Sequence, residues 1–242
     1  MTEERSPTVL VVGGSGVVGQ ALCLRFSQHR WRVGIHSRTN ENLAQALVQS
    51  IIQDGGKAKA FRADVTYQEQ INTMVERVME EWQRLDVLVY AVGINIDRLT
   101  IRLKPDEWET IIRTNLTGAF YCIKSVAAVF QNQGQGAILI ISSLSSIQGG
   151  IGQTAYSASK AGLSGLVKST AIEWGASNIR INAIFPGWHH SWLSQDALSK
   201  HDFSTQVLGR SPQISEVTNL AYHLAESHDI SGQVFNFDNR II

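Results

Sequence analysis

The chain has 242 residues, of which 43% are hydrophobic and 17% charged, with 20 glycines. This composition is typical of a globular protein with a substantial core, and it excludes disordered, collagen-like and coiled-coil chains. Lysine plus arginine number 21, as do aspartate plus glutamate, so no global field attracts nucleic acid or an anionic membrane. We therefore expect a small-molecule partner.

The cysteines and the N-terminus both favour an intracellular protein. Cys23 and Cys122 lie far apart in stretches that indicate apolar helices, which favours buried free thiols in a reducing compartment. Glu3 and Glu4 stand where a targeting signal would be basic, and no run approaches the roughly 18 apolar residues of a membrane span. We expect a soluble, cytoplasmic protein without membrane contact.

Short runs rich in valine, isoleucine and leucine alternate with longer stretches of helical character. The runs mostly lack polar alternation, as strands buried on both faces of a parallel sheet require. The predicted strands are Thr8–Val12, Trp31–His36, Lys57–Phe61, Val87–Ala91, Ala137–Ile141, Arg180–Phe185 and Gln233–Phe237. The predicted helices are Val17–Gln28, Glu41–Gln53, Tyr67–Trp82, Asp106–Gln131, Thr154–Trp174 and Ser215–Ala225.

This alternation predicts an α/β fold: a Rossmann-like, doubly wound parallel sheet of seven strands with helices on both faces. No linker interrupts it, so residues 1–242 are predicted to form a single domain. Pro105 marks the first turn of one helix, and Thr66 with Glu69 forms a predicted capping box for another. The irregular stretch at about 188–211 is predicted to be a substrate-binding loop.

A glycine-rich turn follows the first predicted strand, where Gly14, Gly16 and Gly19 form a G-x-G-x-x-G pattern. Glycines between a strand and a helix let the backbone approach a dinucleotide pyrophosphate, which the helix amides then bind. The alternative is a plain tight turn. The residues predicted to contact a cofactor in this segment are Gly13, Ser15, Gly16, Val18 and Gly19.

The end of the second strand bears on the choice of cofactor. An acidic side chain there would bind the adenosine ribose and repel a 2′-phosphate, whereas this chain has Ser37 followed by Arg38. The arginine suits a 2′-phosphate, so NADPH is predicted over NADH; the alternative is a solvated arginine at a strand end. Asp64, after the third strand, could bind the adenine amino group or begin the turn before Thr66.

Four polar residues are candidates for chemistry. Tyr156 and Lys160 are four residues apart, which places them on one face of a predicted helix. Ser143 ends the fifth strand, and open α/β sheets bind ligands at the carboxyl ends of their strands. Asn115 lies in the segment Arg113–Gly118.

Several segments in combination resemble the short-chain dehydrogenase/reductase family, in its single-domain branch, over nearly the whole chain. These segments are Gly93–Leu99, Glu107-Trp108, Thr114–Gly118, Tyr156–Leu163, Ile181–Gly187 and Ile230–Gln233. Within the family, the chain is most similar to 3-oxoacyl-[acyl-carrier-protein] reductases and acetoacetyl-CoA reductases.

The resemblance implies a catalytic tetrad of Asn115, Ser143, Tyr156 and Lys160. Reduction of a ketone by hydride leaves an alkoxide, which needs a proton donor and stabilising hydrogen bonds. Tyr156 would donate the proton, while Lys160 would lower the pKa of the phenol and hold the nicotinamide ribose. Ser143 would orient the carbonyl oxygen, and Asn115 would fix a water that returns a proton through Lys160.

The resemblance also extends the predicted cofactor site and implies a homo-oligomer, either a dimer or a tetramer. Beyond the glycine-rich turn, the implied cofactor-binding residues are Ser37, Arg38, Asp64, Val65, Gly93, Tyr156, Lys160, Pro186, Gly187 and Ser191.

The chain departs from the family's pattern at several places. In the glycine motif, Val17 stands where the family usually has glycine, and Gly16 stands where a basic residue often assists NADP binding. Ser191 would replace a threonine that contacts the nicotinamide carboxamide. The usual Asn-Asn-Ala-Gly is Tyr90–Gly93, which predicts the loss of polar side chains that brace the centre of the sheet. The usual Asp-Gly-Gly near the C-terminus is Asp238–Arg240.

A metal site is not predicted. His189 and His190 are adjacent in the loop, and adjacent residues there rarely reach one ion. No carboxylate or cysteine cluster accompanies them in the sequence.

Two functions from different classes stay open. The first is an NADPH-dependent ketoreductase acting on a 3-oxoacyl thioester. The segment Gln131–Gln135 lacks the basic residues that an acidic acyl-carrier protein would favour, so a CoA ester, a polyketide-type intermediate or an unrelated ketone stays open as the substrate. The second is a dinucleotide-binding partner subunit with little turnover, which the altered glycine and C-terminal motifs suggest. The complete tetrad favours the enzyme.

Overall fold

The computed structural model describes residues 6–189 and 206–240. Seven strands form one parallel sheet in the order β3-β2-β1-β4-β5-β6-β7. The strands are β1 Thr8–Val12, β2 Arg32–Ser37, β3 Lys57–Arg62, β4 Val87–Tyr90, β5 Gly136–Ile141, β6 Ile179–Phe185 and β7 Val234–Asn236. The predicted sheet is confirmed, and no strand boundary differs from its prediction by more than one residue.

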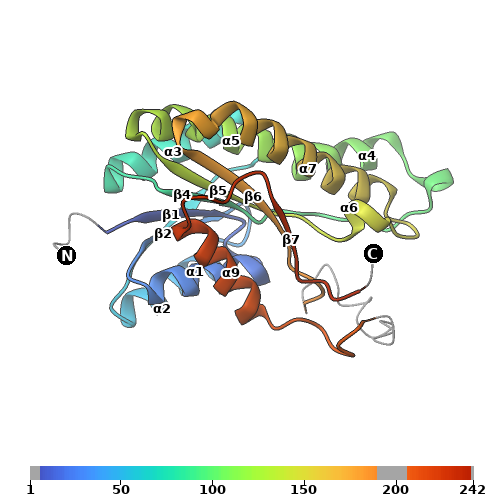
Figure 1. Ribbon diagram of the computed structural model, residues 1–242, viewed down its shortest axis with the longest axis horizontal. Helices are drawn as coiled ribbons and strands as arrows, with labels where there is room; N and C mark the ends of the chain where they lie inside the picture. The colour runs from blue at the N-terminus through green and yellow to red at the C-terminus, as the bar shows by residue number, and fades with distance from the viewer. Residues whose placement is uncertain (1–5, 190–205, 241–242) are drawn as a thin grey trace.

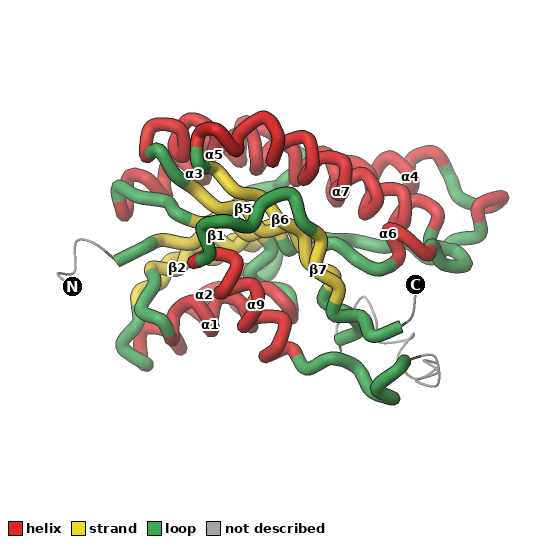
Figure 2. The backbone as a smooth tube through the Cα atoms, viewed as in Figure 1, coloured by secondary structure: helices red, strands yellow, loops and turns green. Residues whose placement is uncertain are grey.

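Helices cover both faces of the sheet, as Figures 1 and 2 show. Helices α3, α4, α5 and α7 lie on one face, and α1, α2 and α9 lie on the other. Their bounds are α1 Val17–Gln28, α2 Glu41–Gln53, α3 Gln68–Trp82, α4 Pro105–Ile112, α5 Gly118–Gln133, α6 Ser145–Gln148, α7 Thr154–Trp174 and α9 Ile214–Glu226. The doubly wound, Rossmann-like arrangement is therefore confirmed.

The sheet separates two apolar cores, and the strand sequences explain how. In β1, Leu10 and Val12 belong to the core beneath α3, α5 and α7, whereas Val9 and Val11 belong to the core beneath α1, α2 and α9. All four side chains are fully buried. Because successive side chains of a strand point to opposite faces, a central strand covered on both sides needs apolar residues at every position.

The predicted helix Asp106–Gln131 is interrupted in the structure. A π-helical turn, Arg113–Thr117, separates α4 from α5. The prediction of one continuous helix is wrong. The flanking residues Ile112 and Gly118 keep right-handed helical dihedral angles, so the chain continues in a helical path while its hydrogen bonds change to the i→i+5 pattern. Such turns are frequent at functional sites, and this one contains Asn115.

Tyr90 braces the centre of the sheet, contrary to the expected loss of bracing there. Its side chain is fully buried at the end of β4, and its hydroxyl donates to the carbonyl oxygen of Thr114 at 2.5 Å. A Cβ atom on Gly118 would lie 2.7 Å from that hydroxyl, so the glycine leaves the room that the tyrosine needs. The phenol thus connects β4 to the π-turn.

The predicted capping box of Thr66 with Glu69 is also wrong. Helix α3 begins after Tyr67, and the Thr66 hydroxyl donates to Asp64 Oδ1 at 2.8 Å instead. Aspartate side chains compete for nearby backbone and hydroxyl donors in this way, and the Thr66 N–H donates to the same oxygen at 2.9 Å.

Cys23 and Cys122 are buried free thiols, as predicted, and burial raises the pKa of each. None of the helices that the structure describes is long and apolar enough to cross a bilayer.

Candidate active site

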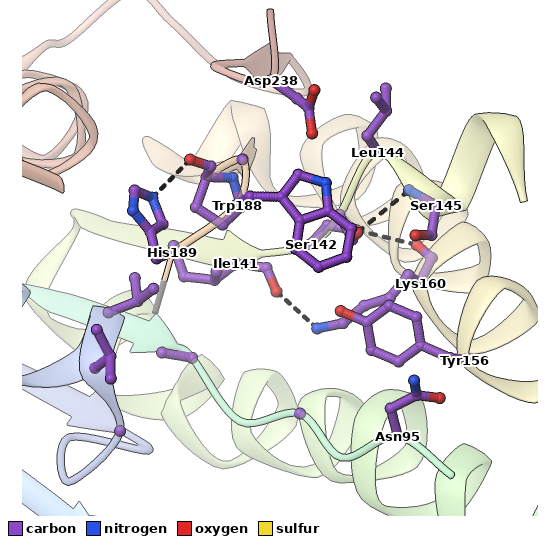
Figure 3. Close-up of a pocket in the computed structure, with 18 of the residues that line it drawn as sticks. Asn95, Ile141, Ser142, Leu144, Ser145, Tyr156, Lys160, Trp188, His189 and Asp238 are labelled. Carbon is purple, nitrogen blue, oxygen red and sulfur yellow. Dashed lines mark hydrogen bonds between the residues drawn. The ribbon is translucent and has the colours of Figure 1, made fainter. Parts of the chain in front are cut away.

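A cavity opens at the carboxyl ends of the strands, where the strand order reverses between β1 and β4 (Figure 3). Ligands of open α/β sheets bind at this switch point. The glycine-rich turn, the loop after β4, the end of β5, α7, the loop after β6 and the C-terminal segment all contribute residues. They are Gly16, Val17, Val18, Gly19, Ala91, Gly93, Asn95, Asp97, Ile141, Ser142, Ser143, Leu144, Ser145, Gln153, Tyr156, Lys160, Pro186, Gly187, Trp188, His189, Asp238 and Arg240.

The glycine-rich turn requires its glycines. Gly13 has φ +88°, and a Cβ there would lie 2.9 Å from the carbonyl carbon of Ala91. A Cβ on Gly19 would lie 2.1 Å from the Gly13 oxygen, a distance no side chain tolerates. Gly16, the N-cap residue of α1, has no side chain that could cap the first-turn amides, and residues 16–19 line the cavity. This donor set fits an anionic pyrophosphate.

Tyr156 and Lys160 lie one turn apart on α7, and both line the cavity. Lys160 is 3% exposed, and its Nζ donates to the carbonyl oxygen of Ile141 at 2.9 Å. The same Nζ is 5.8 Å from the centre of the Tyr156 ring. Gly93 makes space for the ammonium group, since a Cβ there would approach Lys160 Nζ to 3.3 Å.

Burial is the main cause of the pKa shifts of Lys160 and Tyr156. It lowers the pKa of Lys160 to about 8, because the cavity wall solvates the ammonium less well than water does. It raises the pKa of Tyr156, and a hydrogen bond with Ser143 offsets part of that increase. The predicted lowering of the Tyr156 pKa by Lys160 is therefore wrong for this structure, in which the ammonium donates to Ile141 rather than to the phenol.

Asn115 is fully buried behind the cavity. Its Oδ1 accepts from the Ile94 N–H at 2.8 Å, and its Nδ2 donates to the Ile94 oxygen at 2.9 Å and to Ser159 Oγ at 3.0 Å. The side chain thus connects the π-turn to the loop after β4 and to α7. Its predicted part in holding a water stays a prediction.

The structure brings most of the predicted catalytic and cofactor residues together and leaves others apart. Those that line the cavity are Gly16, Val18, Gly19, Gly93, Ser143, Tyr156, Lys160, Pro186 and Gly187. Those not among its lining are Gly13, Ser15, Ser37, Arg38, Asp64, Val65 and Asn115. Ser191 and His190 lie outside the described residues.

The predicted adenosine end lies at the tips of β2 and β3. Ser37 is 3% exposed, whereas the Arg38 side chain is 53% exposed, so the arginine is the accessible group. Arg38 Nη1 lies 3.7 Å from Asp64 Oδ2. Asp64 also begins the turn to Thr66, which bears out one of the two interpretations of that carboxylate.

Sequence reasoning missed His36, the residue before Ser37. Its ring is buried between the glycine-rich turn and the end of β3: the Gly13 N–H donates to Nδ1 at 3.0 Å, and Nε2 lies 2.9 Å from the Ala63 oxygen. Burial lowers the pKa of His36 to about 4, so the ring is neutral at neutral pH. A polar residue inside an apolar strand was the available signal.

Sequence reasoning also missed how Arg240 extends the cavity. Arg240 donates from Nε and Nη2 to Asp238 at 2.7 and 2.6 Å, and its guanidinium lies 5.9 Å from the centre of the Trp188 ring.

His189 Nε2 lies 2.8 Å from the Pro186 oxygen, and burial lowers the pKa of His189. Within residues 6–189 and 206–240, no three histidine, cysteine, aspartate or glutamate side chains form a possible metal site.

Comparison with known proteins gives a consistent result. The model of the short chain dehydrogenase family matches residues 7–202. The 3-oxoacyl-[acyl-carrier-protein] reductase of Synechocystis sp. is 31% identical over 245 residues, covering 100% of this chain and 99% of the relative. The enzyme of the same name from Thermotoga maritima is 34% identical over 238 residues, covering 96% of each.

Solved structures agree in fold. A variant of actinorhodin polyketide ketoreductase, solved with NADPH, superposes with a TM-score of 0.92 at 26% identity, covering 99% of this chain and 98% of the other. The protein gox2181 has the same TM-score at 28% identity, with 98% and 96% covered. With a family match over most of the chain and relatives above 30% identity along its length, this protein belongs to the short-chain dehydrogenase/reductase family of oxidoreductases.

Proposed function

We propose that this enzyme is an NADPH-dependent ketoreductase that reduces a 3-oxoacyl thioester. The observation that carries the proposal is the convergence of Ser143, Tyr156 and Lys160 in one cavity with the glycine-rich turn. The names of the relatives support the thioester, and the ketoreductase solved with NADPH supports the cofactor. We further propose that residues 1–242 act as a single domain and that the enzyme is a homo-oligomer.

The residues present fit a dinucleotide, which when bound supplies the hydride. The α1 amides and the glycine-rich turn would hold its pyrophosphate, because they combine helix N-terminal donors with a backbone free of side chains. Arg38 would pair with the 2′-phosphate, Asp64 would meet the adenine, and Pro186 and Gly187 would border the nicotinamide end.

Tyr156 would donate the proton that the reduced carbonyl oxygen needs. Since burial raises the pKa of its phenol, the side chain holds its proton through the neutral range and can release it to a more basic alkoxide. Ser143 forms a hydrogen bond with this phenol and lies in the loop directly after β5, so both hydroxyls can point at one carbonyl oxygen. Lys160 would add positive charge beside the developing anion.

The substrate assignment is tested by following NADPH oxidation with 3-oxoacyl-CoA, 3-oxoacyl-carrier-protein and simple ketone substrates. We expect turnover of a thioester at least about tenfold more efficient than that of a simple ketone, because remote binding energy increases kcat/KM. Turnover of ketones alone would contradict the thioester. NADPH binding without turnover of any substrate would instead support the partner-subunit hypothesis.

Arg38→Ala should weaken NADPH binding selectively. The guanidinium is exposed and only loosely paired with Asp64 at 3.7 Å, so a 2′-phosphate can displace that contact. Loss of a charge-assisted hydrogen bond predicts a rise of about 10- to 100-fold in the NADPH Kd, with little change for NADH. Calorimetric titration of both cofactors measures this, and equal affinities in the unmutated enzyme would refute the NADPH preference.

A further inference from the structure

His36 connects three backbone segments around the proposed adenosine end of the cofactor site. It is 2% exposed near the end of β2, directly before Ser37 and Arg38. One ring nitrogen meets Gly13 of the glycine-rich turn, and the other meets Ala63, directly before Asp64. All three segments contain residues that the proposed function assigns to the dinucleotide.

The two partners determine the tautomer of the ring. The Ala63 carbonyl can only accept, so Nε2 carries the proton and donates to it. The Gly13 N–H can only donate, so Nδ1 must be the unprotonated nitrogen. A neutral imidazole is therefore the form that satisfies both contacts at once.

The position of the Gly13 peptide affects the rest of the glycine-rich turn. Gly13 has φ +88°, and its carbonyl oxygen accepts from the Gly16 N–H at 3.0 Å, which closes the turn that opens α1. The same carbonyl faces Gly19 so closely that a Cβ there would lie 2.1 Å away. A shift of the Gly13 peptide would therefore move the cavity wall formed by the first turn of α1.

We propose that His36 is a positioning residue for the dinucleotide: by accepting the Gly13 N–H it holds the glycine-rich turn in the shape that binds the pyrophosphate. The inference rests on the proposed cofactor site and assigns a role to a side chain that does not line the cavity. It also predicts that only one of the two imidazole hydrogen bonds matters for binding.

Two conservative variants separate the two bonds. His36→Asn places an amide oxygen where Nδ1 stood, so it can accept from Gly13 but cannot reach Ala63. His36→Gln places an amide nitrogen near the position of Nε2, so it can donate to Ala63 but leaves the Gly13 N–H without its acceptor. Each variant loses one buried hydrogen bond, and both should lower the melting temperature by similar amounts.

Nucleotide binding should differ between the variants. We expect the NADP⁺ Kd, measured by calorimetry, to stay within about threefold of the unmutated enzyme in His36→Asn and to rise about tenfold in His36→Gln. His29→Gln is the control, because His29 is an exposed residue stacked on Tyr222. Circular dichroism with the thermal melts confirms that each variant is folded before its Kd is compared.

Equal Kd values for the Asn and Gln variants, both folded, would overturn the proposal and leave His36 a purely structural residue. A Kd that rises only in His36→Asn would overturn it as well, by assigning the effect to the Ala63 bond. If the unmutated enzyme itself fails to bind NADP⁺ or NAD⁺, the proposed function fails instead, and the two failures are thereby distinguished.

Discussion

Tyr156→Phe should lower kcat by at least about two decades while leaving NADPH affinity nearly unchanged. The substitution removes one oxygen and keeps the ring that lines the cavity, so the packing of α7 is preserved. The transition state, however, loses the acid that would protonate the alkoxide, and general acid catalysis is worth about 10² to 10⁴ in rate. Steady-state kinetics and calorimetric NADPH titration of the variant measure the two quantities separately.

Tyr222→Phe is the matched control for this substitution. Tyr222 lies on α9 in an aromatic cluster with Phe26 and Trp31, and it is not among the residues that line the cavity. The same chemical change there should leave kcat unaltered. If Tyr156→Phe retained full reductase activity, the proton donor would have to be a different group, with Ser143 the next to be replaced.

The strands could be predicted closely because burial on both faces leaves a strong signal in the sequence. A run such as Val9–Val12 must be apolar at every position to satisfy the two cores. The helices α1, α2 and α7 also begin and end where predicted, since glycines and polar residues mark their limits. Local composition therefore determines these elements.

The errors arose where a particular hydrogen bond of the folded chain outweighs a pattern in the sequence. Thr66 has the spacing of a capping residue, but its hydroxyl bonds to Asp64. Tyr90, where the family usually has asparagine, predicted the loss of a polar side chain that braces the sheet. Its hydroxyl instead donates to the carbonyl of Thr114, 24 residues away in the chain. The Thr66–Asp64 bond is a local one that competes with the cap, whereas the Tyr90–Thr114 bond forms only once the fold brings the two segments together.

In the candidate site, too, residues that are close in the chain could be paired from the sequence, whereas residues that the fold brings together could not. Tyr156 and Lys160 could be paired from their spacing, because four residues make about one helical turn. His36 could not be assigned, because its partners Gly13 and Ala63 lie on different segments that only the parallel sheet brings together. Arg240 likewise joins the cavity only because the C-terminal segment returns past β6.

Lys160→Met should lower kcat and NADPH affinity together, unlike Tyr156→Phe. Methionine keeps most of the volume of this buried side chain, so the main change is loss of the ammonium charge and its donors. The charge would stabilise the developing alkoxide, and the donors would hold the nicotinamide ribose. We expect kcat to fall by at least about two decades and the NADPH Kd to rise at least about tenfold. Lys168→Met, an exposed lysine on the same helix, is the control and should change neither.

The pH dependence of the unmutated enzyme should reflect the titration of the Lys160 ammonium group. Burial lowers the pKa of Lys160 to about 8, so the side chain is cationic below that pH and neutral above it. The contribution of the charge is therefore present below pH 8 and lost as the pH rises through that value. Because kcat/KM reports groups of the free enzyme, kcat/KM for NADPH should fall above about pH 8 in the unmutated enzyme and stay flat in Lys160→Met. A fall that persists in the methionine variant would assign the titration to another group.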